Sequence, residues 1–168
     1  MPTFSVNLTR FSPYPNFRFL VYFGTSTTPV AAVQKVGGLK RKTDVISYKE
    51  GGNPIERKSM GRTTYDPITL DRGLTHDTDF EKWANAAQVL DTGAPVQSLK
   101  ELRKDVRIVL LNEAGQPVHA YKVYRCWVSE YTALPDLDGG GNSVAIEHIK
   151  LENEGWEHDL TVGEPTEV

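Results

Sequence analysis

The sequence has little of what most catalytic and metal-binding proteins depend on. One cysteine, Cys126, occurs among 168 residues, so an intramolecular disulfide is impossible and a metal site built from several cysteines is excluded. Its flanking residues are typical of a strand, which favours a buried, inert thiol over a nucleophile. The four histidines have neither HExxH nor HxH spacing. We therefore expect no metal ion and no cofactor.

The sequence also lacks an excess of positive charge and a long apolar run. Its net charge is -3 and its pI about 5.8, which argues against a protein whose affinity depends on neutralising nucleic-acid phosphates. We expect no tight DNA binding by the free subunit. No apolar run approaches the roughly 20 residues that span a bilayer, and the N-terminus does not resemble a signal peptide. We expect a chain that is made in the cytoplasm and has no membrane-spanning segment.

No motif in the sequence supplies a recognisable set of catalytic or ligand-binding residues. The stretch YKEGGNPIERKSMGRT at 48–63 has glycines and basic residues but no Gly-Lys-Ser/Thr that leads into a helix, as a phosphate loop requires. No serine lies in a GxSxG pattern. The segment DLDGGGN at 136–142 lacks the alternating ligands and terminal Glu of a calcium loop, which favours a Gly-rich turn. The sequence thus indicates a protein that is not an enzyme.

Turn-forming residues are abundant, with 14 glycines and 10 prolines, which is typical of a mainly β or α+β domain. The clearest strand is NFRFLVYF at 16–23, where Phe17, Phe19, Val21 and Phe23 alternate on one face. The pattern predicts further strands at 30–36, 43–49, 65–72, 106–111, 118–131 and 143–152. Pro67 in one of them suggests an edge strand or a bulge.

One amphipathic helix of about 12 to 15 residues is predicted between the fourth and fifth strands. It begins at a capping box formed by Thr78 and Glu81. Gly93 and Pro95 end it. Its apolar stripe, with Trp83 as a core anchor, consists of Phe80, Trp83, Ala84, Ala87 and Leu90.

The fold class expected is mainly β (α+β), an antiparallel β-sandwich or partly closed barrel. A single domain spans 1–168, with an N-terminal arm at 1–15, a core at 16–156 and a flexible acidic tail at 157–168. Several strands carry apolar residues on both faces, which favours burial of the outer face against other subunits. The outward-facing residues predicted for this role are Leu20, Tyr22, Tyr121 and Val123.

The segment at 48–63 is longer than a hairpin connection needs, and such loops usually carry function. It combines cations, anions and apolar side chains, which suits docking onto another protein surface. The predicted docking residues are Tyr48, Lys49, Glu50, Gly51, Gly52, Asn53, Ile55, Glu56, Arg57, Lys58, Met60 and Arg62.

Several segments in order resemble a known family. They are NFRFLVYF, VQKVGGLKRKTDVISYKEGG, LDRGLTHD, FEKWAN and LNEAGQPVHAYKVYRCW. Together they resemble the tail tube proteins of contractile phages and the inner tube proteins of extracellular contractile injection systems, over roughly 17–156. The haemolysin-coregulated tube of type VI secretion shares that fold, with a weaker sequence resemblance.

The resemblance implies a β-barrel or sandwich protomer that forms hexameric rings, which stack into a hollow tube inside a contractile sheath. It implies sheath, baseplate or spike proteins as partners, and cargo protein or DNA in the lumen. It makes 48–63 an inter-ring docking loop. It also implies a component of a phage virion, or of a released or cell-anchored injection particle, assembled in the bacterial cytoplasm.

Two functions of other classes remain open from the residues. One is a stand-alone β-sandwich module that binds a protein or glycan, and the other is a small hydrolase with a scattered site. The resemblance also leaves open whether the particle is a phage or an injection system, and whether the chain forms the main tube or its first or terminal ring.

Overall fold

The computed structural model describes residues 3–30, 33–86 and 98–168. Seven strands form one antiparallel sheet: β1 (Phe19–Phe23), β2 (Val33–Val36), β5 (Ile68–Gly73), β6 (Lys104–Leu111), β7 (Pro117–Thr132), β8 (Ile146–Glu152) and β9 (Trp156–His158). Two more, β3 (Arg41–Tyr48) and β4 (Arg57–Tyr65), form a separate hairpin. The helices described are α1 (Asp79–Ala86) and α2 (Leu99–Leu102).

The sheet runs in the order β1-β6-β7-β8-β5-β2, with β9 added beside β7. The 16-residue strand β7 joins its two halves, because it pairs with β6 and β9 near its start and with β8 near its end. Between them Arg125 adopts a positive φ of 53°, and the register with β6 shifts nearby. Such irregularities bend a strand. The predicted mainly β fold is confirmed, and the sheet is not closed.

The core lies between the two halves of this bent sheet. Val21, Val106 and Val123 come from one half, whereas Leu70 and Ile149 come from the other. Cys126 also belongs to this core, and the prediction of a buried thiol is confirmed. Burial raises the pKa of the Cys126 thiol to about 12. The thiol is therefore protonated at neutral pH and a poor nucleophile.

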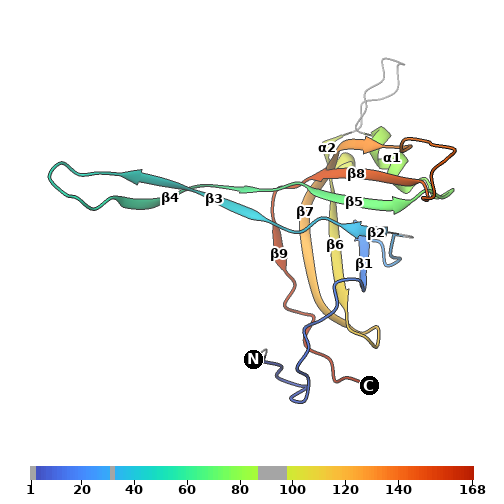
Figure 1. Ribbon diagram of the computed structural model, residues 1–168, viewed down its shortest axis with the longest axis horizontal. Helices are drawn as coiled ribbons and strands as arrows, with labels where there is room; N and C mark the ends of the chain where they lie inside the picture. Colours follow the sequence, from blue (N-terminus) through green and yellow to red (C-terminus); the bar gives the residue numbers. More distant parts are fainter. Residues whose placement is uncertain (1–2, 31–32, 87–97) are drawn as a thin grey trace.

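Helix α1 packs against β7 beside the core, at the top of the view in Figure 1. Phe80 and Trp83 are buried, as predicted. Trp83 donates from Nε1 to the carbonyl of Leu102 at 2.9 Å, which ties α1 to the short helix α2 that the sequence did not predict. At the helix start the N–H of Asp79 donates to Oδ1 of Asp77 at 3.0 Å, instead of the capping box expected from Thr78 and Glu81. The expected end of the helix, with Ala87, Leu90, Gly93 and Pro95, lies outside the described residues.

Several predicted orientations were wrong. Val123 is 0% exposed and lies in the core, so its side chain is not available to another subunit. Tyr121 lies on the same face of β7 as Val123 but is only half-buried, with its ring stacked on that of His158 at 5.0 Å between centroids. Conversely, Phe17 precedes β1 and is 71% exposed. Pro67 lies just before β5, which pairs with both β8 and β2 and so is not an edge strand.

Gly37 follows β2 where the chain passes close to β5. Its N–H donates to the Thr69 carbonyl at 2.7 Å, and a Cβ at Gly37 would lie 2.7 Å from Thr69 Oγ1 and 3.0 Å from Thr69 N. We expect Gly37→Ala to force β2 away from β5 and to lower the free energy of unfolding by about 1–3 kcal/mol. Gly38→Ala is the matched control, because a Cβ there meets nothing within 4 Å. Urea unfolding of both variants checks this, and equal midpoints would contradict it.

In the described ranges no helix has the length and apolar character needed to cross a membrane.

Candidate functional site

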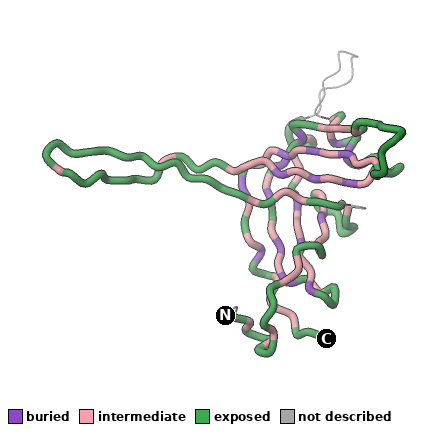
Figure 2. The backbone as a smooth tube through the Cα atoms, in the orientation of Figure 1, coloured by how far each residue is buried: buried purple, intermediate pink, exposed green. Residues whose placement is uncertain are grey.

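Among the strands that the structure describes, β3 and β4 pair only with each other, and they form a hairpin that projects from the sheet (Figure 1). We call residues 41–65 the arm. Its register runs from Arg41 opposite Tyr65 to Tyr48 opposite Arg57. Figure 2 shows that almost the whole arm is exposed. The sequence prediction of an irregular loop at 48–63 was wrong in part, because the connection covers only 49–56 and the rest of the segment belongs to β3 and β4.

The base of the arm is held by β9 and the residues before it. The ring of Tyr65 meets that of Trp156 edge-on, with 6.3 Å between centroids. The guanidinium of Arg41 lies 5.8 Å from the centre of the same indole. Asn153 donates from Nδ2 to the carbonyl of Asp66 at 3.0 Å. These contacts fix the direction in which the arm leaves the domain.

A β-bulge interrupts the arm between the pairs Thr43–Thr63 and Val45–Met60. Gly61 lies in the bulge, where a Cβ would approach the carbonyl oxygen of Asp44 to 3.0 Å. The hydroxyl groups of Thr43 and Thr63 are 2.9 Å apart and close the pair below it. Bulges increase the local twist of a hairpin, so Gly61 helps to set the orientation of the outer half of the arm.

The tip of the arm is a polar turn. Gly52 has a φ of +83°, which favours glycine. The N–H of Asn53 donates to the Glu50 carbonyl at 3.1 Å, and the Asn53 side chain accepts the N–H of Ile55 at 3.0 Å. Glu50 and Arg57 form an ion pair at 3.7 Å. Because both groups are exposed, this pair contributes little to stability.

The arm exposes apolar side chains on both of its faces. Val45 lies opposite Met60 on one face, and Ile46 and Tyr48 alternate onto the other. Met60 is 88% exposed. Isolated two-stranded hairpins are marginally stable in water, and exposed apolar residues gathered on one element mark interaction sites. The arm therefore has the properties of a surface that is completed by a partner.

The arm differs from the rest of the chain in the sign of its net charge. Residues 41–65 include six basic and three acidic residues, whereas the other residues include 13 basic and 19 acidic ones. The predicted docking residues all lie in this positive arm, and all but Asn53 are exposed. The sequence missed Val45 and Ile46, whose alternation with polar residues was visible but was attributed to a strand of the main sheet.

A second surface lies at the open edges of the sheet, β1 and β2. A cavity of about 800 Å³ opens there, and its lining is mostly apolar. Phe19, Leu39, Ile108 and Tyr121 are among the residues that line it. On the outer face of β1, Leu20 and Tyr22 are half-buried. Among the described strands, β1 and β2 each have one neighbouring strand, and such a sheet edge beside apolar side chains is suited to contact with another chain.

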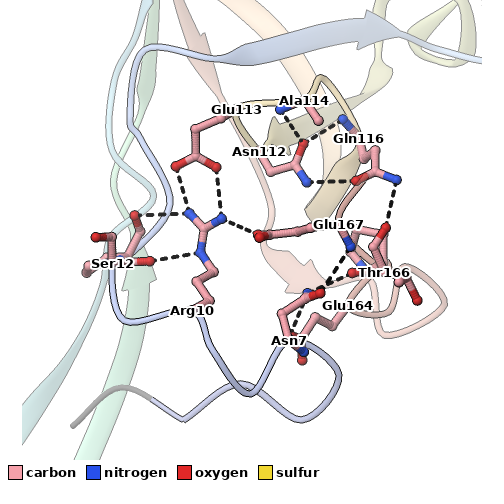
Figure 3. Close-up of polar contacts among 12 residues, drawn as sticks. Asn7, Arg10, Ser12, Asn112, Glu113, Ala114, Gln116, Glu164, Thr166 and Glu167 are labelled. Carbon is pink, nitrogen blue, oxygen red and sulfur yellow. Dashed lines mark hydrogen bonds and ion pairs between the residues drawn. The ribbon is translucent and has the colours of Figure 1, made fainter.

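The two chain ends meet at the opposite side of the domain from α1 (Figure 1). Glu164 accepts hydrogen bonds from the N–H groups of Ser5, Val6 and Asn7 at 2.7–2.9 Å. We call these contacts between the two chain ends the clasp. Figure 3 shows Glu164 beside Asn7 within it. The tail at 157–168 was predicted to be flexible, but the carboxylate of Glu164 within it is hydrogen-bonded to the N-terminal segment.

Arg10 extends the clasp to the turn between β6 and β7 (Figure 3). Its guanidinium forms a bidentate ion pair with Glu113, in which both N···O distances are 2.8 Å. It also forms an ion pair with Glu167. Gln116 in the same turn donates to the carbonyl of Thr166 at 3.1 Å. Two-pronged arginine–carboxylate pairs are geometrically specific, so both chain ends are held at one place.

Acidification should open the clasp at Glu164. Burial raises the pKa of Glu164, but hydrogen bonds from Asn7, Val6 and Ser5 outweigh it and lower the pKa from 4.5 to about 2. A carboxylate with a lowered pKa stabilises the fold above its ordinary pKa, and loses that contribution as the pH falls towards 2. We expect Glu164→Gln at pH 7 to lower the protection of the Ser5–Asn7 amides against hydrogen exchange, and acid to lower it in the wild type when rates are compared with the intrinsic rates at the same pH. Glu130→Gln, at an exposed position, is the control, and equal exchange in both variants would contradict the role of Glu164.

Three of the four histidines make local side-chain contacts in the described structure. Nδ1 of His119 lies 3.0 Å from Nε2 of His158, and His148 pairs with Asp71. Burial, followed by the nearby His158, lowers the pKa of His119. Within the described ranges, no group of three or more His, Cys, Asp or Glu residues is placed to hold a metal ion.

Comparison with known proteins identifies the fold. The model of the family described as T4-like virus tail tube protein gp19 matches residues 15–157. A chain in a cryo-EM structure of the PVC extracellular contractile injection system, a sheath–tube complex in the extended state, is 25% identical. The match covers 94% of this chain and 99% of that one, with a TM-score of 0.75. A chain of the anti-feeding prophage baseplate is also 25% identical, covering 89% and 97%, with a TM-score of 0.70.

The SPP1 tail tube protein shares the fold at 12% identity and a TM-score of 0.58, covering 92% of this chain and 82% of that one. Among curated proteins, no sequence matches.

Proposed function

Because the chain belongs to the tail tube protein family of T4-like viruses, we propose that it forms hexameric rings that stack into the hollow inner tube of a contractile particle. The PVC sheath–tube complex supports this, since the similarity spans nearly all of both chains. In this proposal the tube is surrounded by sheath proteins and joined to a baseplate or spike. Cargo protein or DNA passes through its lumen, and assembly takes place in the bacterial cytoplasm.

The exposed arm is the structural feature that best supports the proposed stacking of rings. It exposes Met60, Ile55 and Val45 to solvent, and it pairs with no other strand in the described part of the protomer. Burial of apolar surface drives most protein association. We propose that the arm docks on the neighbouring ring, as the resemblance implies for 48–63, with the docking surface extended to 41–65.

Contacts within the ring are proposed at the open edge of the sheet. The half-buried Leu20 and Tyr22 and the apolar cavity between β1 and β2 lie there. A contact between two different surfaces of one chain closes into a ring when the rotation permits it. Val123, buried in the protomer, takes no part.

An injection particle is favoured over a phage tail. The chains from the PVC and anti-feeding prophage structures have 25% identity and TM-scores of 0.75 and 0.70, compared with 12% and 0.58 for the SPP1 tail tube protein. No comparable observation favours a hydrolase or a glycan-binding module, and the family itself consists of structural tube proteins.

Negative-stain electron microscopy of the purified protein over a range of concentrations tests the proposal. We expect six-fold rings at moderate concentration and stacked tubes at higher concentration. Monomers alone, in several buffers and at high concentration, would contradict it. Light scattering of the same samples gives the mass of the particles.

A further inference from the structure

The loop between β7 and β8, residues 133–145, forms a surface whose chemistry is the opposite of that of the arm. It has two acidic residues, Asp136 and Asp138, and no basic residue. Its apolar side chains are unusually exposed, with Leu137 at 72% and Val144 at 76%. The arm combines exposed apolar side chains with excess positive charge, whereas this loop combines them with negative charge only.

The loop has a defined shape. Asp138 accepts the N–H of Gly140 on its side chain at 2.9 Å and the N–H of Gly141 on its carbonyl at 3.0 Å. Beside this turn lies a hollow of about 160 Å³, lined among others by Asp136, Leu137, Asp138 and Val144. Two carboxylates therefore border a depression of mixed polar and apolar lining that is large enough for one side chain.

The arm of the same protomer cannot reach this loop. Strand β5 begins at Ile68, just after the arm, and ends at Gly73, which pairs with Ile146 directly after the loop. The arm base and the loop are thus separated by the length of β5, about 20 Å at about 3.3 Å per residue. The arm also points away from the body on the side opposite to the loop (Figure 1). Any contact between the two must join different copies of the chain.

We propose that the loop at 133–145 of one copy receives the arm of another. This rests on the proposed function and names the surface on which the arm docks. Met60 and Lys58 share one face of β4, so an apolar side chain and a cation are presented together. In the loop, Leu137 stands between Asp136 and Asp138, which offers an apolar contact next to two anions. Because the surfaces lie at opposite ends of the protomer, the contact is head-to-tail and repeats from copy to copy.

Cross-linking tests the contact directly. The variant Met60→Cys/Leu137→Cys should form, on mild oxidation, a ladder of disulfide-linked multimers, because each copy offers one thiol at each end. Met60→Cys and Leu137→Cys alone are the controls and can give dimers at most, since the native thiol of Cys126 is buried. A double variant that yields only monomers and dimers overturns the proposal.

Charge reversal supplies a second, independent readout. Asp136→Lys/Asp138→Lys and Arg57→Glu/Lys58→Glu should each raise the concentration needed for tubes by about tenfold or more, because like charges then face each other. Combining the four changes in one chain should restore assembly. If the loop variant forms tubes as the wild type does while the arm variant fails, the loop is not the receptor, although arm docking stands. If both variants form wild-type tubes, this inference and arm docking both fail.

Discussion

Shortening the arm is expected to leave the protomer folded and to abolish the stacking of rings. The variant replaces residues 46–59 by an Asn-Gly turn that closes the hairpin at the Val45–Met60 pair, since this dipeptide suits a two-residue hairpin turn. The removed residues are almost all exposed and contribute nothing to the core. If each arm contributes only about 1 kcal/mol, six arms contribute about 6 kcal/mol per ring junction, which is about 10⁴-fold in the stacking equilibrium.

The measurement combines circular dichroism with electron microscopy. We expect a wild-type spectrum and melting temperature at low concentration, with single rings instead of tubes at high concentration. Glu50→Gln is the control, because it removes only the exposed ion pair with Arg57 and keeps the length of the arm. Long tubes from the shortened variant would refute arm docking, and loss of the folded spectrum would show that the arm belongs to the domain's stability.

Replacing Arg72 is expected to destabilise the protomer more than any surface substitution. Its side chain is 0% exposed and lies opposite Glu147 in the pairing of β5 with β8. Nε donates to Glu147 at 2.6 Å, Nη2 donates to the carbonyl of Asp77 at 2.8 Å, and the guanidinium lies 4.0 Å from the centre of the Phe80 ring. Tyr131 donates its hydroxyl to the other oxygen of Glu147 at 3.1 Å. Arginine is rarely buried so fully without such partners.

Arg72→Met should lower the free energy of unfolding by about 3–5 kcal/mol, because it leaves the Glu147 carboxylate buried without its cation. The double variant Arg72→Met/Glu147→Gln should recover much of this loss, since the uncompensated charge is then gone. Arg18→Met, at an exposed position, is the control and should change stability by no more than about 0.5 kcal/mol. Urea unfolding in the arm-shortened background, at the low concentration at which rings do not form, keeps assembly out of the measurement. An unchanged midpoint for Arg72→Met would contradict the role of the pair.

The strands of the main sheet were predictable where one face is buried and the other is not. Alternation located β1 and the core position of Val21, and the helical spacing located Phe80 and Trp83 in α1. The order of the segments indicated the tail tube family. These features are local or depend on residue order, so they can be predicted from the sequence alone.

The arm could not be recognised as a paired hairpin, because it has no buried face in the protomer. Met60, Gly61 and Arg62 gave a pattern like that of a loop, although β4 pairs with β3 on both sides of the bulge. Val123 was assigned outward because both faces of β7 carry apolar residues, and only the bend at Arg125 and the pairing with β9 decide which face is inside. Alternation gives the two faces of a strand but does not say which one is covered.

By itself, then, the sequence determined the mainly β class, the apolar core positions of β1 and α1, and the tube family. Only the tertiary structure decided that Arg72 is buried against Glu147, that the chain ends are clasped at Glu164, and that the arm and the loop at 133–145 lie at opposite ends. The physical reason is the same in each case. These features join residues far apart in the chain, and their energies depend on distances that exist only once the sheet has bent around its core.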